Sequence, residues 1–212
     1  MSATVELVTT DGIFALDGGE WEVTNNIWLV GDDREVVVID AAHDHSPIVA
    51  AVNGRRVTAI ALTHGHNDHI NAATALADAV DAPIWLHPDD RMLWDVVHPS
   101  RAPDRDLADG MVLAAGGAEL GVLHTPGHSP GCCCFHVASG SGPDVVFSGD
   151  TLFCGGPGAT GRSHSDFPTI IESIRRTLLS LPPETVVHTG HGESTTVGAE
   201  APHLQEWIDR GH

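Results

Sequence analysis

Three imidazoles and one carboxylate stand within six positions of the sequence, at His64, His66, Asp68 and His69. They follow the apolar run Val57–Thr63, which predicts a β-strand, and they precede apolar residues at helical spacing. His64 and His66, two residues apart at the strand end, can share one metal ion. Asp68 and His69, at the helix start, can turn toward a second ion. Imidazole with carboxylate suits zinc, iron or manganese, so these side chains leave the metal open.

Chance is the alternative explanation, because the chain contains 15 histidines. Burying several polar rings against an apolar strand is costly unless a partner satisfies them, and this favours metal binding for the cluster. The remaining histidines lack such a context. We assign no role to those in ordinary polar or terminal settings, namely His43, His45, His87, His98, His203 and His212.

The elements that must position this cluster are short and of both kinds. Strands are predicted at Ile27–Val30 and Val36–Asp40, which form a hairpin, and at Val57–Thr63, Ile84–Leu86, Val112–Ala114, Glu119–His124, Cys132–Val137, Val145–Ser148 and Thr185–His188. Helices are predicted from an N-cap at Ser46 through Val52, from Asp68 to Val80, and at Asp89–Val97, Pro168–Leu179 and Ala199–Arg210. This order fits two sheets packed together with helices outside.

Length and composition predict a single domain over residues 1–212. With 212 residues and 42% hydrophobic content, the chain can build one compact core. Its opening residues show no basic stretch followed by an apolar run, and no segment approaches the ~18 uninterrupted apolar residues of a membrane span. We therefore expect an unprocessed, cytoplasmic protein without a membrane partner.

Charge argues against nucleic acid as a partner. The formal net charge is -19, and all ten basic residues are arginines. The pairs Arg55–Arg56 and Arg175–Arg176 are the nearest approach to a basic stripe, and solvated helix or loop faces explain them more simply. The chain contains neither lysine nor tyrosine.

The cysteines predict no disulfide framework. Cys132, Cys133 and Cys134 are consecutive in an apolar stretch, and neighbouring strand residues point to opposite faces. The run lacks the C-x₂₋₄-C spacing of a zinc site, so we expect reduced thiols that pack as small core residues, and Cys154 stands apart.

The motifs together resemble the metallo-β-lactamase-fold superfamily, whose signature H-x-H-x-D-H precedes a distant His, Asp and His. Three later segments match in order: Thr125–Gly131, Ser148–Phe153 and Thr189–Gly192. The resemblance implies an αββα sandwich and assigns every ligand. One ion would be held by His64, His66 and His128, the other by Asp68, His69 and His191, with Asp150 bridging the two and Asp40 steadying the ligand loop from behind.

Within the superfamily, the sequence is most similar to glyoxalase II, the hydroxyacylglutathione hydrolases. Zinc-dependent β-lactamases usually have cysteine or serine where this chain has Asp150, and Cys154 lies four residues too late. Four features resemble glyoxalase II: the segments TPGHSPG and SGDTLF, the pair Gly161-Arg162, and GHG followed by Thr195-Thr196. Persulfide dioxygenases share much of this pattern and bind one iron through two histidines and the aspartate.

The resemblance implies a hydrolase that cleaves a small-molecule thioester or ester by attack of a hydroxide bridging two divalent ions. Zinc is the preferred metal, with iron or manganese as alternatives, and Asp68 would orient the hydroxide as well as bind metal. Two other functions stay open: an iron-dependent persulfide dioxygenase and a metal-binding interaction domain without catalysis.

Substrate recognition is expected from a loop that follows a G-x-G-x-x-G match at residues 156–161. No strand-turn-helix unit surrounds this match, which argues against a dinucleotide site. We expect instead a rim loop whose Arg162, Ser163, His164 and Asp166 touch substrate. Glyoxalase II contacts glutathione through lysine, tyrosine and a helical extension that this sequence lacks after His191, so a neutral polyol thiol such as mycothiol is the expected carrier.

Overall fold

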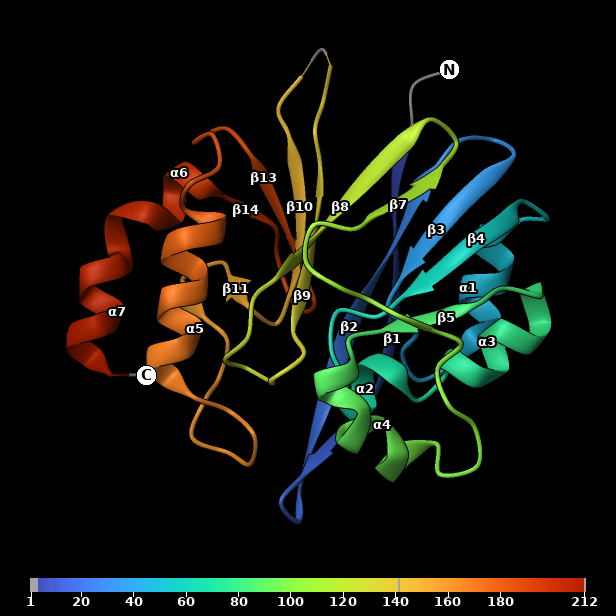
Figure 1. Cartoon of the computed structure of the whole chain (residues 1–212), viewed down its shortest axis with the longest axis horizontal. Coiled ribbons are helices and arrows are strands. Elements are labelled where there is room, and N and C mark those ends of the chain that lie inside the picture. The colour runs from blue at the N-terminus through green and yellow to red at the C-terminus, as the bar shows by residue number, and fades with distance from the viewer. Residues whose placement is uncertain (1–3, 141, 212) are drawn as a thin grey trace.

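Two six-stranded β-sheets pack against each other in the computed structural model, which describes residues 4–140 and 142–211. Helices cover the outer face of each sheet (Figure 1). This layer order confirms the predicted αββα sandwich. His212, to which the sequence gives no role, lies outside the described residues.

The first sheet comes from the N-terminal half of the chain. Its strands, in spatial order, are β1 (Thr4–Leu16), β2 (Gly19–Gly31), β3 (Glu35–Ile39), β4 (Arg56–Ala61), β5 (Ile84–Leu86) and β6 (Arg105–Asp106). The first three strands are antiparallel neighbours, and β3 to β6 run parallel.

The second sheet comes from the C-terminal half. Its order is β14 (Thr195–Thr196), β13 (Val186–Thr189), β10 (Val145–Gly149), β9 (Cys133–Val137), β8 (Ala118–His124) and β7 (Val112–Ala115). A separate small hairpin pairs β11 (Leu152–Phe153) with β12 (Gly156–Pro157).

The helices divide between the two outer layers (Figure 1). On the side of the first sheet lie α1 (His45–Val52), α2 (Asn67–Ile70), α3 (Ala73–Val80), the 3₁₀ turn η1 (Pro88–Asp90) and α4 (Arg91–Val97). On the side of the second lie α5 (Phe167–Ser173), the π-helical turn η2 (Ile174–Leu178), α6 (Val197–Glu200), the 3₁₀ turn η3 (Ala201–His203) and α7 (Leu204–Arg210). Within the described ranges, none of the helices combines the length and apolar character needed to cross a bilayer.

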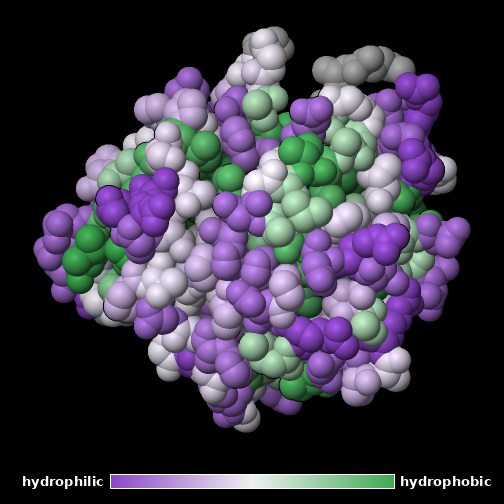
Figure 2. All heavy atoms as spheres, viewed as in Figure 1, coloured by the Kyte–Doolittle hydropathy of each residue, from purple (hydrophilic) through white to green (hydrophobic). Residues whose placement is uncertain are grey.

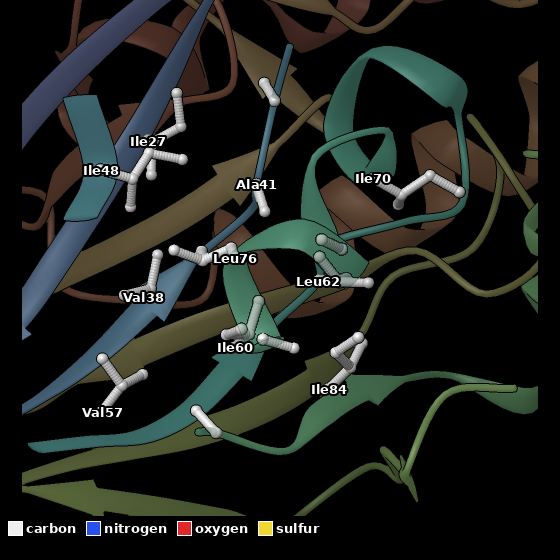
Figure 3. Packing of buried hydrophobic residues seen from close by; sticks show 14 of the residues in the cluster. Ile27, Val38, Ala41, Ile48, Val57, Ile60, Leu62, Ile70, Leu76 and Ile84 are labelled. Carbon is white, nitrogen blue, oxygen red and sulfur yellow. The ribbon is translucent and has the colours of Figure 1, made fainter. Parts of the chain in front are cut away.

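Alternation along the strands builds three separate cores. In β3, Val36 and Val38 pack with α1 and α3, while Val37 and Ile39 face the second sheet. Figure 3 shows the first of these cores, in which Val38 lies near Ile48 and Leu76 of the helices. Because the period of a strand is two residues, each central strand contributes to a core on both faces.

The cysteine run follows the same rule. Cys133 joins the core between the sheets, and Cys134 points into the core under α5 and α7. All four cysteines are free thiols; Cys132 is also buried, whereas Cys154 is exposed. Burial raises the pKa of Cys134 to about 11, so this thiol stays protonated at neutral pH.

Two predicted helix starts and ends are wrong. The N-cap of α1 is Asp44 and not Ser46, because the Asp44 carboxylate accepts the Ser46 N–H at 2.8 Å. The helix predicted from Ala199 to Arg210 breaks into three pieces at Pro202, which has no N–H to continue the helical ladder.

The helix predicted from Asp68 to Val80 is also interrupted. Ala41 accepts the backbone N–H of Ala72 at 3.0 Å and donates its own N–H to the carbonyl of His69 at 2.9 Å. These bonds replace intrahelical ones, so α2 ends at Ile70 and α3 begins at Ala73. Asp40 likewise lies outside its predicted strand, because its φ of 64° ends β3 at Ile39.

The N-terminal hairpin is the largest element that sequence reasoning missed, since only Ile27–Val30 of its two strands was predicted. β1 and β2 pair along 13 residues each around Asp17 and Gly18, whose φ angles are 52° and 77°. Two consecutive positive φ angles match the tight hairpin turn that Asp-Gly favours. The hairpin extends past the sheet (Figure 1) toward the loop that precedes α5.

Hydrophilic residues dominate the face shown in Figure 2, with hydrophobic residues in small groups between them. Both arginine pairs contact carboxylates. Arg55 binds Glu6 at 2.6 Å, and Arg175 binds Glu172 at 2.7 Å. These guanidinium groups are therefore already paired within the chain.

Candidate metal centre

The seven predicted ligands lie at loops and helix starts that follow strands of both sheets. His64 and His66 follow β4, and Asp68 and His69 stand in α2. The second sheet supplies the other three from the loops after β8, β10 and β13, namely His128, Asp150 and His191. The centre therefore spans the junction between the two halves of the molecule.

The first ligand cluster consists of His64, His66 and His128. Nε2 of His64 lies 3.0 Å from Nδ1 of His66, which lies 3.0 Å from Nε2 of His128. Nitrogens that each bind one ion at about 2.0–2.1 Å are separated by about 3 Å or slightly more. These three rings can therefore share one ion.

The second cluster consists of Asp68, His69 and His191. The two Nε2 atoms of His69 and His191 lie 3.2 Å apart. Oδ2 of Asp68 lies 3.5 Å from the first of them and 3.3 Å from the second. The distances are slightly longer than those in the first cluster, and the group adds one negative charge.

Asp150 lies between the clusters. Its Oδ1 is 3.3 Å from Nε2 of His69, and its Oδ2 is 3.6 Å from Nε2 of His128 and 3.5 Å from Nε2 of His191. One carboxylate oxygen can therefore serve each ion. Gly190 makes this close approach possible, because a Cβ there would lie 2.3 Å from Oδ1 of Asp150.

Backbone carbonyls orient two of the rings from behind. Nδ1 of His128 donates to the carbonyl of Ala159 at 2.8 Å, and Nδ1 of His191 donates to the carbonyl of Thr24 at 2.8 Å. A proton held on the outer nitrogen leaves the lone pair of the inner one for a metal.

Asp40 orients the ring of His69 in the same way. Its Oδ2 accepts from Nδ1 of His69 at 2.8 Å, while Oδ1 accepts the backbone N–H of Thr63 at 2.7 Å. The carboxylate is only 2% exposed, so these bonds form away from solvent. The structure thus places Asp40 directly behind a predicted ligand.

Buried polar atoms show that the residues fit two cations. Nε2 of His66, Oδ1 of Asp68 and Oδ1 of Asp150 are buried, and none of them has a hydrogen-bond partner in the described part of the chain. Unpartnered buried polar atoms are costly, and lone pairs that face one another at 3 Å add repulsion. Two divalent ions would bind the lone pairs that face one another in the two clusters, satisfy Oδ1 of Asp150 and offset the charge of the carboxylates.

The two clusters differ in protonation. Burial lowers the pKa of His66 to about 3, which keeps its ring neutral as a ligand must be. Burial alone would lower the pKa of His191 too, but the carboxylates of Asp150 and Asp68 raise it to about 10. Burial would raise the pKa of Asp68, yet the neighbouring imidazoles lower it to about 2. A metal entering the second cluster therefore displaces protons.

Asp90 joins the ligand loops and was not identified from the sequence. Its fully buried carboxylate accepts the backbone N–H groups of Gly65 and Gly131 at 2.7 and 2.6 Å and the hydroxyl of Ser129 at 2.6 Å. Gly65 lies between two ligands, and Ser129 follows a third, His128. The sequence offered no signal for this role, because its donors are 25 to 41 residues away.

A pocket of about 230 Å³ opens onto the metal clusters. Its walls are mainly apolar, and they come from both strands of the N-terminal hairpin and from the loop after β12. The lining residues are Phe14, Leu16, Trp21, Val23, His66, Asp68, His128, Asp150, Phe153, Ala159, Arg162, Ser163, Ser165 and His191. The hairpin walls were missed because the strands that carry them were not predicted.

Two of the four predicted rim residues line the pocket and two do not. Arg162 and Ser163 line the pocket, and the Arg162 guanidinium lies 3.8 Å from the ring centre of Trp21. His164 and Asp166 are not among the lining residues. Asp166 instead caps α5, because its carboxylate accepts the Thr169 N–H at 2.9 Å.

A separate group of His87, Asp89 and His124 lies away from this pocket. The rings of His87 and His124 stack at 4.1 Å with an angle of 9° between their planes. An imidazole lone pair lies in the plane of its ring, so two nearly parallel rings do not converge on one ion.

Known proteins with the same sequence motifs belong to one superfamily. Residues 21–191 match the model of the metallo-beta-lactamase superfamily. The hydroxyacylglutathione hydrolase GloC of Haemophilus influenzae is 32% identical over 190 residues, which cover 82% of this chain and 87% of that protein.

Two crystal structures give the same fold. TTHA1623 in a di-iron-bound form is 38% identical, with a TM-score of 0.73 over 84% of this chain and 93% of that one. The BLEG-1 B3 metallo-beta-lactamase is 29% identical, with a TM-score of 0.76 over 92% of this chain and 98% of that one.

Proposed function

Because the chain belongs to the metallo-beta-lactamase superfamily, whose members are mostly metal-dependent hydrolases, we propose that it is a two-metal thioester hydrolase. The observation that carries the proposal is the position of Asp150, whose two carboxylate oxygens face histidines of both clusters. A carboxylate shared in this way allows two cations to lie close together over one substrate bond. We propose zinc as the preferred metal, with iron or manganese as alternatives.

Two divalent ions, when bound, would lower the pKa of a shared water toward neutrality and polarise the scissile carbonyl. Asp68 is the residue that would orient this water. Oδ2 of Asp68 faces the histidines of the second cluster, whereas its Oδ1 is buried and has no hydrogen-bond partner among the described residues. We propose that this free oxygen accepts a proton of the attacking water and directs its lone pair at the carbonyl.

The pocket walls explain why a thioester suits the site. Phe14, Trp21 and Phe153 offer apolar surface beside the ligands, and such surface excludes bulk water from the reacting bond. A thiolate leaves readily without protonation by an acid, and the described pocket lining contains no aspartate, glutamate, histidine, cysteine or lysine other than the predicted metal ligands. The name of the Haemophilus influenzae relative supports a thioester acyl group as well.

We propose a neutral polyol thiol, such as mycothiol, as the carrier. Arg162 is the one arginine among the described lining residues, and its guanidinium stacks on Trp21 and Phe14. Glutathione presents two carboxylates, and a formal charge of -19 repels them. The hydroxyls of Ser163 and Ser165 can instead donate to and accept from carrier hydroxyls.

Thiol release from a panel of acyl thioesters, measured without oxygen on zinc-loaded and iron-loaded protein, tests the proposal. We expect turnover that stops when a chelator removes the metal. A protein that turns over no thioester in either form, but consumes oxygen with a persulfide, would instead be an iron-dependent dioxygenase. A protein inactive in both assays would be a metal-binding interaction domain.

A further inference from the structure

A chain of hydrogen-bonded side chains ends on the metal ligand Asp68. Asn71 contacts His43, His43 contacts Asn25, and Asn25 contacts Asp68. Asn25 lies in the middle of β2 and His43 in the loop before α1, whereas Asp68 belongs to α2 and Asn71 to the turn after it. From the sequence we predicted no role for His43 or Asn25.

The direction of the first bond is fixed by the backbone. The N–H of His43 can only donate, and it lies 2.5 Å from Oδ1 of Asn71. The other end of that amide, Nδ2, is therefore the group that lies 3.2 Å from Nδ1 of His43. Since an amide nitrogen donates, Nδ1 of His43 is the acceptor, and the neutral ring carries its proton on Nε2.

The same logic fixes the second amide. Nε2 of His43 donates to Oδ1 of Asn25 at 2.8 Å, which turns Nδ2 of Asn25 toward the metal centre. Nδ2 donates to Oδ2 of Asp68 at 3.1 Å. It also lies 3.3 Å from Nε2 of His69 and 3.5 Å from Nε2 of His191, so the amide borders every ligand of the second cluster.

The surroundings keep the chain of bonds intact. Asn25 is fully buried. The His43 ring lies against β1, where a Cβ on Gly12 would come within 2.1 Å of Nδ1. Only glycine leaves room for the ring at that point.

We propose that Asn25 and His43 are positioning residues, which hold the Asp68 carboxylate in place for the second ion. His43 sets the direction of the amide, so that Asn25 presents a donor to the ligating oxygen. In the reverse direction, the amide oxygen would face the carboxylate and repel it. The inference rests on the two-ion centre of the proposed function and is independent of the substrate.

Cobalt(II) binding to the full chain, followed by visible absorption and by competition with a chelating dye, tests the proposal apart from catalysis. In Asn25→Ala, we expect one of two ions to bind about ten- to a hundredfold more weakly, the range for residues that support metal ligands. His43→Leu should show a similar loss, and the double variant should lose little more, because both changes break one chain. His43→Gln keeps an N–H near the position of Nε2 and should retain affinity within about threefold of wild type.

Asn67→Ala is the matched control. Asn67 is the neighbour of Asp68 and also bonds β1, through the carbonyl of Ile13 and the N–H of Ala15, but its amide is not bonded to a ligand. Its cobalt affinity should equal that of wild type. If Asn25→Ala does not fold, Asn25→Ser, whose side chain is too short to reach Asp68, replaces it. Wild-type affinity for both ions in the Asn25 variant, or additive losses in the double variant, would overturn the proposal. If the wild-type protein itself binds only one ion, the two-ion centre is overturned instead.

Discussion

Replacing Asp150 by asparagine removes one charge from the centre without changing the shape of the side chain. In wild type, each cluster has three ligands of its own, and a tetrahedral ion needs about four, so Asp150 completes both sites. The carboxylate oxygens lie 3.3 to 3.6 Å from the Nε2 atoms of His69, His128 and His191. An asparagine keeps one ligating oxygen and replaces the other by an NH₂ group, which does not bind a cation.

One site should therefore keep four ligands and the other only three. The negative charge facing two dications falls from two carboxylates, Asp68 and Asp150, to one. We expect the weaker site to lose at least about a hundredfold in affinity, equivalent to about 2.7 kcal/mol, and turnover to fall by a similar factor.

Elemental analysis after dialysis against a defined metal buffer is the direct assay, paired with the initial rate of thiol release. Wild type should carry close to two ions per chain and Asp150→Asn close to one. Asp95→Asn removes the same charge from the exposed surface of α4 and should match wild type. Two retained ions together with a near-normal rate in Asp150→Asn would refute the bridging role.

Three other expectations can be checked independently. Asp90→Ala should lower the free energy of unfolding by about 3 kcal/mol in urea denaturation, because three buried donors of two ligand loops lose their acceptor; an unchanged midpoint would contradict this. Burial lowers the pKa of His188 to about 4, below its unfolded value of 6.5, so the folded ring resists protonation and stability should fall as pH drops from 6.5 toward 4. His188→Gln should flatten that fall in a series of thermal melts, and equal slopes would show that another group titrates. For one acyl group, kcat/KM should be higher on a polyol thiol than on glutathione, and equal or better turnover of the glutathione ester would remove the case for a neutral carrier.

Four of the metal ligands could be predicted because they sit in one short local motif, whereas His128, Asp150 and His191 were assigned through the family resemblance. His64 to His69 fall within one turn of chain, and the imidazole-carboxylate spacing carries its own chemical meaning. The layer order was predictable too, since β3 and β4 are apolar runs that match their cores on both faces. The structure brings the seven predicted ligands together.

The supporting residues could not be predicted, because their roles depend on distant partners. Asn25 acts on a carboxylate 43 residues away, and Asp90 binds backbone donors that leave no trace in residue type. The residues of the pocket walls could not be predicted for another reason. The hairpin strands that carry Phe14 and Trp21 alternate apolar and polar residues only partly, and half of that surface faces solvent.

Each ion would be gripped by both halves of the molecule, since His128 completes a cluster begun by His64 and His66, and His191 completes one begun by Asp68 and His69. During synthesis, neither cluster is whole until its distant histidine has left the ribosome and the second sheet has docked. We therefore expect each site to reach its full affinity for metal only after the two sheets have packed together.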